Sequence, residues 1–281
     1  MALITVDEKK CKKDGICASE CPFVLISQKD PESLPEAVPN AEKLCIRCGH
    51  CVAVCPHGAL SLAGMDEADY PFIQKGLKLS PEQAEQFLRS RRSIRLYKDR
   101  PAPREVLQKL VELARYAPTA HNDQEVRWLV IEDKVQVQRL AGVIVDWLRS
   151  VVASDPAAAK KMHLDLILGA WDFGMDVITR NAPHLVINFA PKKSPFAELY
   201  PLDCAMALAY LELAAPVFGM GSCWNGMLLF AASQSQAVRE ALGIAPEYQI
   251  CGALMLGYPK YKYTRLAGRK PPQITWGLNG G

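Results

Sequence analysis

The sequence predicts an α+β protein of two domains, and three observations lead to that prediction. Seven of the ten cysteines lie in the first 64 residues, so the N-terminal part has a composition of its own. A polar, turn-prone run follows near Leu62. Beyond residue 80, segments of helical and strand periodicity alternate irregularly, which favours α+β over a doubly wound sheet. We therefore predict domains at residues 1–64 and 80–281, joined by a linker at 65–79.

The cysteines of the first domain form an internal repeat, which is rarely accidental. Its members recur 34 residues later in the same order: Cys11, Asp14, Gly15, Cys17 and Cys21-Pro22 become Cys45, Cys48, Gly49, Cys51 and Cys55-Pro56. The second copy has the spacing C-x2-C-x2-C-x3-C-P, which is the bacterial iron–sulfur run. In the first copy, Asp14 stands in the place of the second thiolate. The repeat therefore predicts two iron–sulfur clusters.

In such a run the fourth cysteine reaches the other cluster, so each cluster takes ligands from both copies. We assign the first cluster to Cys11, Asp14, Cys17 and Cys55. We assign the second cluster to Cys45, Cys48, Cys51 and Cys21. Glycine permits tight backbone in each loop, and the proline after the last cysteine stops the loop from continuing as helix. We expect a 4Fe-4S cluster at the second site and a 4Fe-4S or 3Fe-4S cluster at the first.

Disulfides and zinc are the competing interpretations of these cysteines. The chain is too long for a disulfide-stapled mini-domain and begins without a secretory signal pattern. Four-cysteine zinc sites usually consist of two separated pairs rather than two tight runs that each end in Cys-Pro. The pattern therefore favours iron–sulfur clusters.

Residues 1–64 resemble the two-cluster bacterial-type ferredoxins, and the first copy resembles ferredoxins whose cluster has an aspartate ligand at the second position. Carboxylate oxygen is a harder and less covalent ligand than thiolate. If Asp14 binds iron, that iron is the labile one and the cluster interconverts between three-iron and four-iron forms. The alternative is that Asp14 points to solvent and a permanent three-iron cluster remains.

Composition limits the classes of function. The chain of 281 residues is 49% apolar and 22% charged, which is typical of a globular protein. A net charge of +3 is too small to indicate nucleic acid or a membrane surface as partner. No apolar run approaches the roughly 20 residues that span a bilayer, and charges stand where a secretory core would be. We expect a cytoplasmic protein.

The elements of the larger domain follow in order. Ser80 is expected to cap a helix that begins at Pro81, with Gln83 completing a capping box. A second helix follows Pro103, since apolar residues recur there at helical spacing. Further strands are expected at 129–131, 184–189 and 250–256, and helices at 140–151, 206–218 and 238–242. The 206–218 segment is almost wholly apolar, so we expect it to be deeply buried.

Five segments of this domain carry candidate binding residues. Three arginines and a serine in Arg91-Arg-Ser-Ile-Arg95 suit phosphate, although a solvated basic face has the same pattern. The others are Ala117-Pro-Thr-Ala-His-Asn-Asp-Gln124, Gly219-Met-Gly-Ser-Cys-Trp-Asn-Gly226, Leu256-Gly-Tyr-Pro259 and Gly268-Arg-Lys-Pro271. In this order they resemble the nitroreductase family of FMN proteins, over residues 80–281. The resemblance implies a mostly antiparallel central sheet flanked by helices, and a homodimer with FMN at the subunit interface.

The resemblance also implies roles for single residues. Arg91, Ser93 and Arg95, with Arg92 beside them, would hold the phosphate and ribityl chain of FMN, and Arg269 with Lys270 would close on the phosphate. The flavin pocket would be lined by Thr119, Asn122 and Gln124. Backbone of Gly221, Ser222, Trp224, Asn225 and Gly226 would lie against the isoalloxazine ring, where glycine allows close approach. The family commonly continues Gln-Pro-Trp, whereas this chain has Gln124-Glu125-Val126, so packing beneath the flavin differs here.

Several other residues are compatible with chemistry but have a simpler structural interpretation. Cys204, Cys223 and Cys251 lack metal spacing and are expected to be buried thiols. His50 and His57 flank the second cluster, and we expect them at the surface or outside the ligand set. His121 is a weak candidate proton donor. Trp171 to Phe173 fall where the family builds a substrate lid, yet helix core is the simpler interpretation.

The two halves together predict an FMN-dependent oxidoreductase that receives electrons through two iron–sulfur clusters and reduces an organic acceptor, such as a nitroaromatic or a quinone. No G-x-G-x-x-G follows a strand, so a Rossmann nicotinamide domain is not expected. The expected partners are a low-potential donor (ferredoxin, flavodoxin or NAD(P)H through a partner) and a small organic acceptor. A non-catalytic electron-transfer or redox-sensing protein is the alternative.

Overall fold

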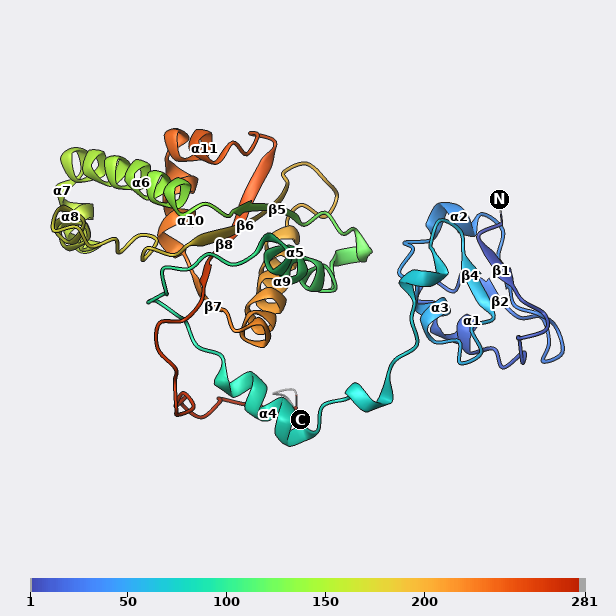
Figure 1. The fold of residues 1–281 in the computed structure, drawn as a ribbon. Coiled ribbons are helices and arrows are strands. Elements are labelled where there is room, and N and C mark those ends of the chain that lie inside the picture. Colours follow the sequence, from blue (N-terminus) through green and yellow to red (C-terminus); the bar gives the residue numbers. More distant parts are fainter. Residues whose placement is uncertain (1, 278–281) are drawn as a thin grey trace. The chain divides into compact units, whose positions relative to one another are not determined.

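The computed structural model describes residues 2–277 of the chain. By its internal contacts the chain divides into two units (Figure 1). The first unit contains Met1–Lys78 together with His121–Asp123, and the second contains Leu79–Ala120 and Gln124–Gly281. Each unit has its own apolar core.

The first unit is built from two short antiparallel ribbons and three short helices. Strand β1 (Ile4–Val6) pairs with β4 (Leu60–Leu62), and β2 (Ile26–Ser27) pairs with β3 (Glu36–Ala37). The helices are α1 (Ile16–Glu20), α2 (Ala41–Leu44) and α3 (His50–Ala53). The first ribbon joins the opening strand of one repeat copy to the closing strand of the other, so the two copies are interlocked rather than side by side.

The sequence repeat is also a repeat of backbone conformation. Gly15 and Gly49 both have positive φ angles, of 70° and 73°, directly before α1 and α3. This confirms the prediction that glycine serves tight backbone in these loops. Positive φ also recurs at Lys13 and Arg47, and at Val24 and Gly58. Each pair is 34 residues apart, so the two loops trace the same path.

The predicted linker is not uniform. Its first part carries the short 3-10 helix η1 (Glu67–Asp69) and then Tyr70, whose hydroxyl donates to Sδ of Met65 (2.8 Å). Tyr70 also packs so closely on Gly49 that a Cβ there would lie 2.5 Å from the phenol oxygen. This part therefore packs on the first unit, whereas η2 (Lys75–Leu77) has no buried residue. The boundary at residue 64 stays a prediction.

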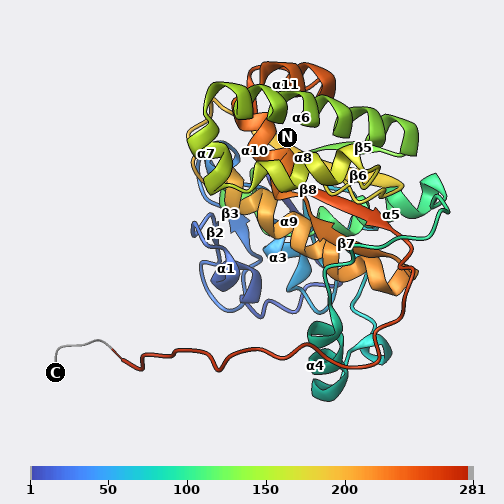
Figure 2. The same cartoon turned by 90° about the vertical axis from the view of Figure 1, so that its left-hand side faces the viewer.

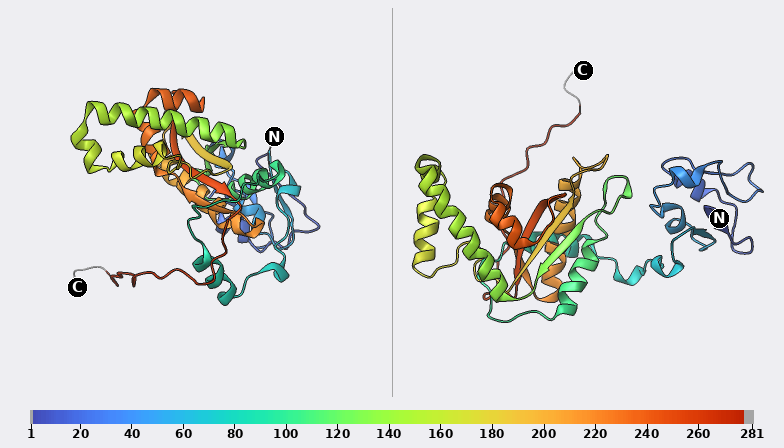
Figure 3. Two further views of the ribbon diagram at one scale, coloured as in Figure 1. Left: turned by 60° about the vertical axis from the view of Figure 1, so that its left-hand side comes forward. Right: turned by 90° about the horizontal axis from the view of Figure 1, so that it is seen from above.

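The second unit is a four-stranded sheet in the order β5-β6-β8-β7, with every pair antiparallel. The strands are β5 (Arg127–Ile131), β6 (His184–Pro191), β7 (Gly221–Trp224) and β8 (Tyr248–Gly257). The right-hand view of Figure 3 shows β5, β6 and β8 side by side. All three predicted strands are present, with β7 added, and the predicted fold class is confirmed.

Helices cover both faces of this sheet (Figure 2). On one face lie α6 (Lys134–Ser154), α8 (Leu164–Asp172), α10 (Gly226–Gln234) and α11 (Gln236–Leu242), with α7 (Pro156–Lys161) between α6 and α8. On the other face lie α5 (Arg104–Ala114) and α9 (Tyr200–Ala214), which continues as the 3-10 helix η4 (Ala215–Phe218). Along β8 the side chains alternate, as a pleated strand requires: Ala253 and Met255 join the first core, Leu254 and Leu256 the second.

The entry to the second unit follows the predicted capping pattern. Helix α4 (Pro81–Ser90) begins after Ser80, whose hydroxyl accepts from the Gln83 amide (3.2 Å) while the Gln83 side chain accepts from the Ser80 amide (2.9 Å). Helices α5 and α11 also form where predicted, and α11 ends at Gly243 with φ of 66°. None of the residues of α4 is buried.

The prediction that residues 206–218 are deeply buried is wrong for one side of the helix. Leu208 and Leu211 are fully buried against the sheet. Met206, Tyr210 and Val217, however, are 37%, 44% and 70% exposed and follow one another at helical spacing. Tyr200–Phe218 is long and apolar enough to cross a membrane, as core helices of folded domains also are, and α9 packs on β6 and β8. An apolar run therefore predicts that a helix has apolar surroundings, but it does not distinguish the protein core from other apolar surroundings such as a membrane.

Candidate functional site

The cysteines of the first unit surround two separate cavities. The first cavity is lined by Cys11, Asp14, Cys17 and Cys55. The second is lined by Cys21, Cys45, Cys48 and Cys51. Cys55 of the second copy therefore lines the first cavity, and Cys21 of the first copy lines the second cavity. The two cavities group these residues in the same sets as the repeat does.

Cys21 and Cys55, which we call the crossing cysteines, each line the cavity of the opposite repeat copy. Backbone amides point at their sulfur atoms. The amide of Leu25 donates to Sγ of Cys21, and the amide of Ala59 donates to Sγ of Cys55, each at 3.3 Å. These two bonds occupy equivalent places in the repeat. A hydrogen bond stabilises the thiolate form of a cysteine, which is the form that binds metal.

The remaining protein environment works against thiolates. Burial, with the nearby Cys55 and Asp14, raises the pKa of the Cys17 thiol. Burial, with Cys48, Cys21 and Cys45, raises the pKa of the Cys51 thiol to about 11. Crowded thiols of this kind ionise when a cationic group lies among them, because its charge reverses the local preference. The donor set therefore fits an iron–sulfur cluster.

A single zinc ion fits less well. Within residues 2–277, no group of three or more His, Cys, Asp or Glu side chains lies close enough together to hold one metal ion. Four donors spread around a cavity suit a larger group with several irons better than one tetrahedral ion.

Asp14 faces the first cavity rather than solvent alone. Its side chain is 35% exposed, its Oδ1 accepts from the Ile16 amide (3.3 Å), and its Oδ2 lies 4.0 Å from Nε2 of His57. The expectation that His57 flanks the second cluster is wrong, because the crossing of Cys55 carries His57 to the first cavity. His50 lines the second cavity and is exposed, as expected.

In the second unit the predicted arginines gather around one pocket of about 300 Å³. We call it the arginine pocket; its lining residues are Arg91, Arg92, Ser93, Arg95, Tyr263, Ala267, Gly268 and Arg269. Residues 91–95 and residues 263–269, which are far apart in the sequence of the second unit, thus line the same pocket. Lys270 is exposed and is not among the lining residues.

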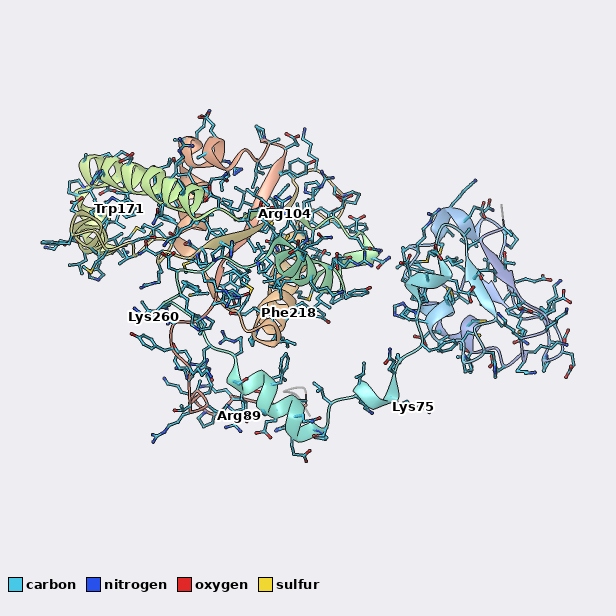
Figure 4. The ribbon with its side chains drawn as sticks, in the orientation of Figure 1. Lys75, Arg89, Arg104, Trp171, Phe218 and Lys260 are labelled. Atoms are coloured by element: carbon cyan, nitrogen blue, oxygen red, sulfur yellow. The ribbon has the colours of Figure 1, made fainter. Side chains whose placement is uncertain are left out.

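Backbone pairing fixes the arginine segment against the sheet. The amide of Ile94 donates to the carbonyl of Ser222 on β7 (2.8 Å), and Ser93 forms a parallel bridge with the same residue. Further along, the amide of Lys260 donates to the carbonyl of Leu96 (3.0 Å), and Lys260 opens the C-terminal segment (Figure 4). The pocket is therefore held by a rigid element on one side.

Glycines let this segment approach the sheet. A Cβ on Gly221 would lie 2.3 Å from Cγ1 of Ile94, and a Cβ on Gly257 would lie 2.8 Å from Cδ1 of Tyr97. The Tyr97 hydroxyl donates to the Ile94 carbonyl (2.6 Å), and burial raises the pKa of that phenol. The space where a Gly221 side chain would lie is thus filled by Ile94.

Two side-chain contacts organise the pocket itself. Nη1 of Arg91 donates to Oε1 of Glu212 on α9 at 3.1 Å, and the Glu212 side chain is 9% exposed. The Arg92 guanidinium lies 4.7 Å from the centroid of the Tyr263 ring. Sequence reasoning missed Glu212, although an acidic residue inside an apolar helix is a signal that could have found it.

The loop after α5 does not line the arginine pocket. Thr119 Oγ1 accepts from the Gln124 amide (3.1 Å), and Gln124 has a φ of 54°. Asn122 groups with the first unit, where its amide donates to the carbonyl oxygens of Ile46 (3.0 Å) and Arg47 (3.1 Å). Within the second unit, Thr119 and Gln124 are therefore not among the residues that line the arginine pocket.

The far end of β7 has a structural task of its own. Asn225 is 2% exposed; its Nδ2 donates to the Ile178 carbonyl (3.1 Å) and its Oδ1 caps α10 by accepting from the Leu228 amide (3.0 Å). Trp224 is 37% exposed, and a Cβ on Gly226 would meet no atom within 4 Å. Ser222 and Gly221 lie at the arginine end of the same strand.

The remaining candidates divide between core and surface. Cys204 and Cys223 are buried thiols as predicted, and Cys251 is partly buried against Cys204. Trp171 on α8 packs on the core, whereas Phe173 is 87% exposed (Figure 4). His121 groups with the first unit, 6.3 Å from the Phe23 ring.

Comparison with known proteins identifies both units. Residues 88–258 match the nitroreductase family, and residues 9–60 match the 4Fe-4S dicluster domain. The chain is 27% identical over 180 residues, 64% of its length and 87% of the relative, to an Archaeoglobus fulgidus protein named NADH dehydrogenase/NAD(P)H nitroreductase. It is 40% identical over 77 residues, 26% of its length and 35% of the relative, to hydrogenase-4 component A of Escherichia coli.

A solved structure shares the fold of the second unit. The nitroreductase with bound FMN from Bacteroides fragilis superposes with a TM-score of 0.55 at 24% identity, covering 69% of this chain and 97% of that one. At this identity the likeness is one of fold. The family match, however, spans more than half of the chain, from α4 to the end of β8. The protein is therefore an oxidoreductase of the nitroreductase family that carries a 4Fe-4S dicluster domain before its nitroreductase domain.

Proposed function

We propose that this protein is an FMN-dependent oxidoreductase that receives electrons through two iron–sulfur clusters and reduces a small organic acceptor, such as a nitroaromatic or a quinone. The observation that carries the proposal is the arginine pocket in a chain that also holds two cysteine-lined cavities. Cavities of that kind alone would suit a simple electron carrier. The arginine pocket suits an anionic cofactor, so FMN would be a second kind of redox group in the same chain.

The residues of the arginine pocket fit the phosphate end of FMN. Four guanidinium groups line it, and Glu212 is the one carboxylate paired with any of them within residues 2–277. Arginine presents planar donor forks that match phosphate oxygens. When bound, FMN supplies two-electron chemistry while the clusters exchange single electrons. The chain's own contribution is to bind and orient these groups.

We assign the cluster ligands as the repeat predicts. Cys11, Asp14, Cys17 and Cys55 would hold the first cluster, and Cys45, Cys48, Cys51 and Cys21 the second. The amides that donate to Cys21 and Cys55 support thiolates at both crossing positions. Asp14 as a ligand is supported by its place on the wall of the first cavity.

We also propose that the protein is a homodimer. A pocket of about 300 Å³ is at the lower limit of cofactor-sized sites, roughly 300–1,000 Å³. Part of the flavin would therefore lie outside it, where a second subunit can cover it. The exposed apolar side of α9 and η4, which includes Met206, Tyr210 and Val217, is a surface of the kind that subunits bury. A second copy of the chain is its proposed occupant.

The proposed donor is a low-potential protein or NAD(P)H acting through a partner, and the proposed location is the cytoplasm. The Archaeoglobus relative is named for NADH and NAD(P)H, so direct use of a nicotinamide is the competing route.

Phe173 and Met175, 87% and 56% exposed beside α8, offer apolar contact to an aromatic acceptor.

Anaerobic stopped-flow absorbance at flavin wavelengths tests the proposed function. The reduced full-length protein is mixed with nitroaromatics, quinones and oxidised carrier proteins in turn. Reoxidation by a small acceptor at catalytic rates, and none by the carriers, is the expected result. Reoxidation by carriers alone would select the non-catalytic electron carrier. No reoxidation by either, with a conformational response to reduction, would select a redox sensor.

A further inference from the structure

The ion pair between Arg91 and Glu212 joins a wall of the arginine pocket to the central helix. Oε1 of Glu212 accepts from Nη1 of Arg91 at 3.1 Å. The Glu212 side chain is 9% exposed and that of Arg91 is 26% exposed, so neither is a freely solvated surface charge. Leu208 and Leu211 on α9 and Ala215 at the start of η4, which are close to Glu212 along the chain, are fully buried. A carboxylate in such surroundings needs a partner.

The pairing has a geometric consequence for Arg91. This residue follows the last turn of α4, and its side chain has several rotatable bonds. An arginine loses rotamer entropy when it is fixed, which weakens any anion site that must fix it on binding. Glu212 already holds one edge of the guanidinium. The other donors remain for a ligand in the pocket.

We propose that Glu212 is a positioning residue for the cofactor phosphate: it orients Arg91 and thereby makes the site selective for a phosphorylated flavin over the unphosphorylated one. The inference rests on the proposed function, since it takes the arginine pocket as the FMN phosphate site. Glu212 contacts no cofactor itself in this role and acts through Arg91. The placement of its carboxylate, rather than its negative charge, is what matters.

Two conservative variants separate placement from charge. Glu212→Gln keeps the length of the side chain and an acceptor oxygen for Arg91 but removes the charge. Glu212→Asp keeps the charge but shortens the reach by one methylene. Neither leaves a large cavity, so both are expected to fold. Glu132→Gln, which removes a carboxylate paired with Arg104 away from the pocket, is the matched control.

The measurement is the dissociation constant of FMN and of riboflavin for the deflavinated full-length protein, from quenching of flavin fluorescence. In the wild type FMN should bind much more tightly than riboflavin. Glu212→Asp should weaken the binding of FMN about tenfold, which is the contribution of one charge-assisted hydrogen bond, and should leave the binding of riboflavin unchanged. Glu212→Gln and Glu132→Gln should retain the wild-type ratio. In an Arg91→Gln background, Glu212→Asp should have no further effect, because the group that it positions is gone.

Other outcomes contradict the proposal in distinct ways. A wild-type protein that binds both flavins equally overturns the phosphate assignment of the pocket, and this inference with it. An unchanged ratio in Glu212→Asp overturns the inference alone. If Glu212→Gln loses as much affinity for FMN as Glu212→Asp does, the inference is also overturned, because the negative charge of residue 212 would then be the cause. A variant that weakens both flavins equally would show that Glu212 serves the fold.

Discussion

At the scale of single residues, Val24 holds a backbone conformation that suits glycine. Its φ is 53°, and its counterpart in the repeat is Gly58, with a φ of 56°. A β-branched side chain is strained in this region, where left-handed backbone costs roughly 1–2 kcal/mol for L-residues. Val24 is 73% exposed, so little burial offsets the strain.

We expect Val24→Gly to stabilise the first unit by about 0.5–1 kcal/mol, the relieved strain less the added freedom of the unfolded glycine. The reciprocal change, Gly58→Val, introduces the same strain and should destabilise by about 1–2 kcal/mol. The midpoint of anaerobic thermal unfolding, followed by cluster absorbance, checks both. A lower midpoint for Val24→Gly would mean that the valine makes a contact worth more than its strain.

Asp14 offers a second prediction at this scale. Replacing it with cysteine supplies a fourth thiolate at the first cavity, so the first cluster should become a stable four-iron cluster. Low-temperature EPR of the oxidised protein should lose any three-iron signal. Asp14→Asn, which keeps the size and removes the charge, should retain or increase that signal. A spectrum unchanged by Asp14→Cys would exclude residue 14 from the ligand set.

At the scale of elements, His184 ties three segments together. Its Nε2 accepts from the Ala102 amide before α5 (2.8 Å), and its Nδ1 pairs with the Glu132 carbonyl after β5 (2.9 Å). A ring that accepts at Nε2 and donates at Nδ1 is neutral. Burial lowers the pKa of His184 below its usual value, consistent with that state.

The sign of the pH effect follows. Below about pH 6.5 the unfolded histidine takes up a proton, while the folded one stays neutral until the pH reaches its lower pKa. His184 therefore makes its full contribution to the free energy of unfolding above about pH 6.5, and this contribution is lost as the pH falls through the pKa of His184 in the folded protein. His184→Gln should cost about 2 kcal/mol at pH 7.5 and less at pH 5, measured by thermal unfolding of both proteins. A difference that does not change with pH would contradict a neutral, buried imidazole.

The exposed apolar side of α9 and η4 also has a testable consequence. Placing a charge there by Val217→Glu should weaken the dimer at least about tenfold, because two like charges would face each other or be buried. Sedimentation velocity over a range of protein concentrations measures this. Val135→Glu, at a residue 69% exposed on α6, is the control and should leave the dimer intact. A wild-type monomer would refute the dimer itself.

At the scale of the whole molecule, the proposed function divides electron entry and acceptor reduction between the two units. We expect a low-potential donor to support acceptor reduction at least about tenfold faster than NADPH, because the proposed route carries electrons through the iron–sulfur clusters to FMN. Steady-state anaerobic rates with each donor measure the ratio, and protein stripped of its clusters is the control. Equal turnover with NADPH after stripping would show that the first unit is dispensable for reduction.

Local sequence signals predicted much of this molecule. The cysteine repeat predicted the two donor sets because ligand spacing is a property of a short loop, and the capping box at Ser80 predicted the start of α4 for the same reason. Contacts distant in sequence were not predictable: Glu212 and Arg91 pair across 121 residues of chain, and only the tertiary fold brings them together. The placement of His57 beside the second cluster was wrong for a different reason: Cys55 was already assigned to the first cluster, and His57 lies two residues after it.

The interlocking of the two repeat copies has a consequence for how the protein is made. Each cavity borrows one donor from the opposite copy, and each ribbon borrows one strand. A nascent chain that has left the ribosome only as far as the first copy therefore holds an incomplete cage. With the proposed ligands, neither cluster has its full set of donors until the second copy has emerged, so insertion of both clusters has to wait for the same stage of synthesis, and a chain cleaved between the copies would leave both cavities short of donors.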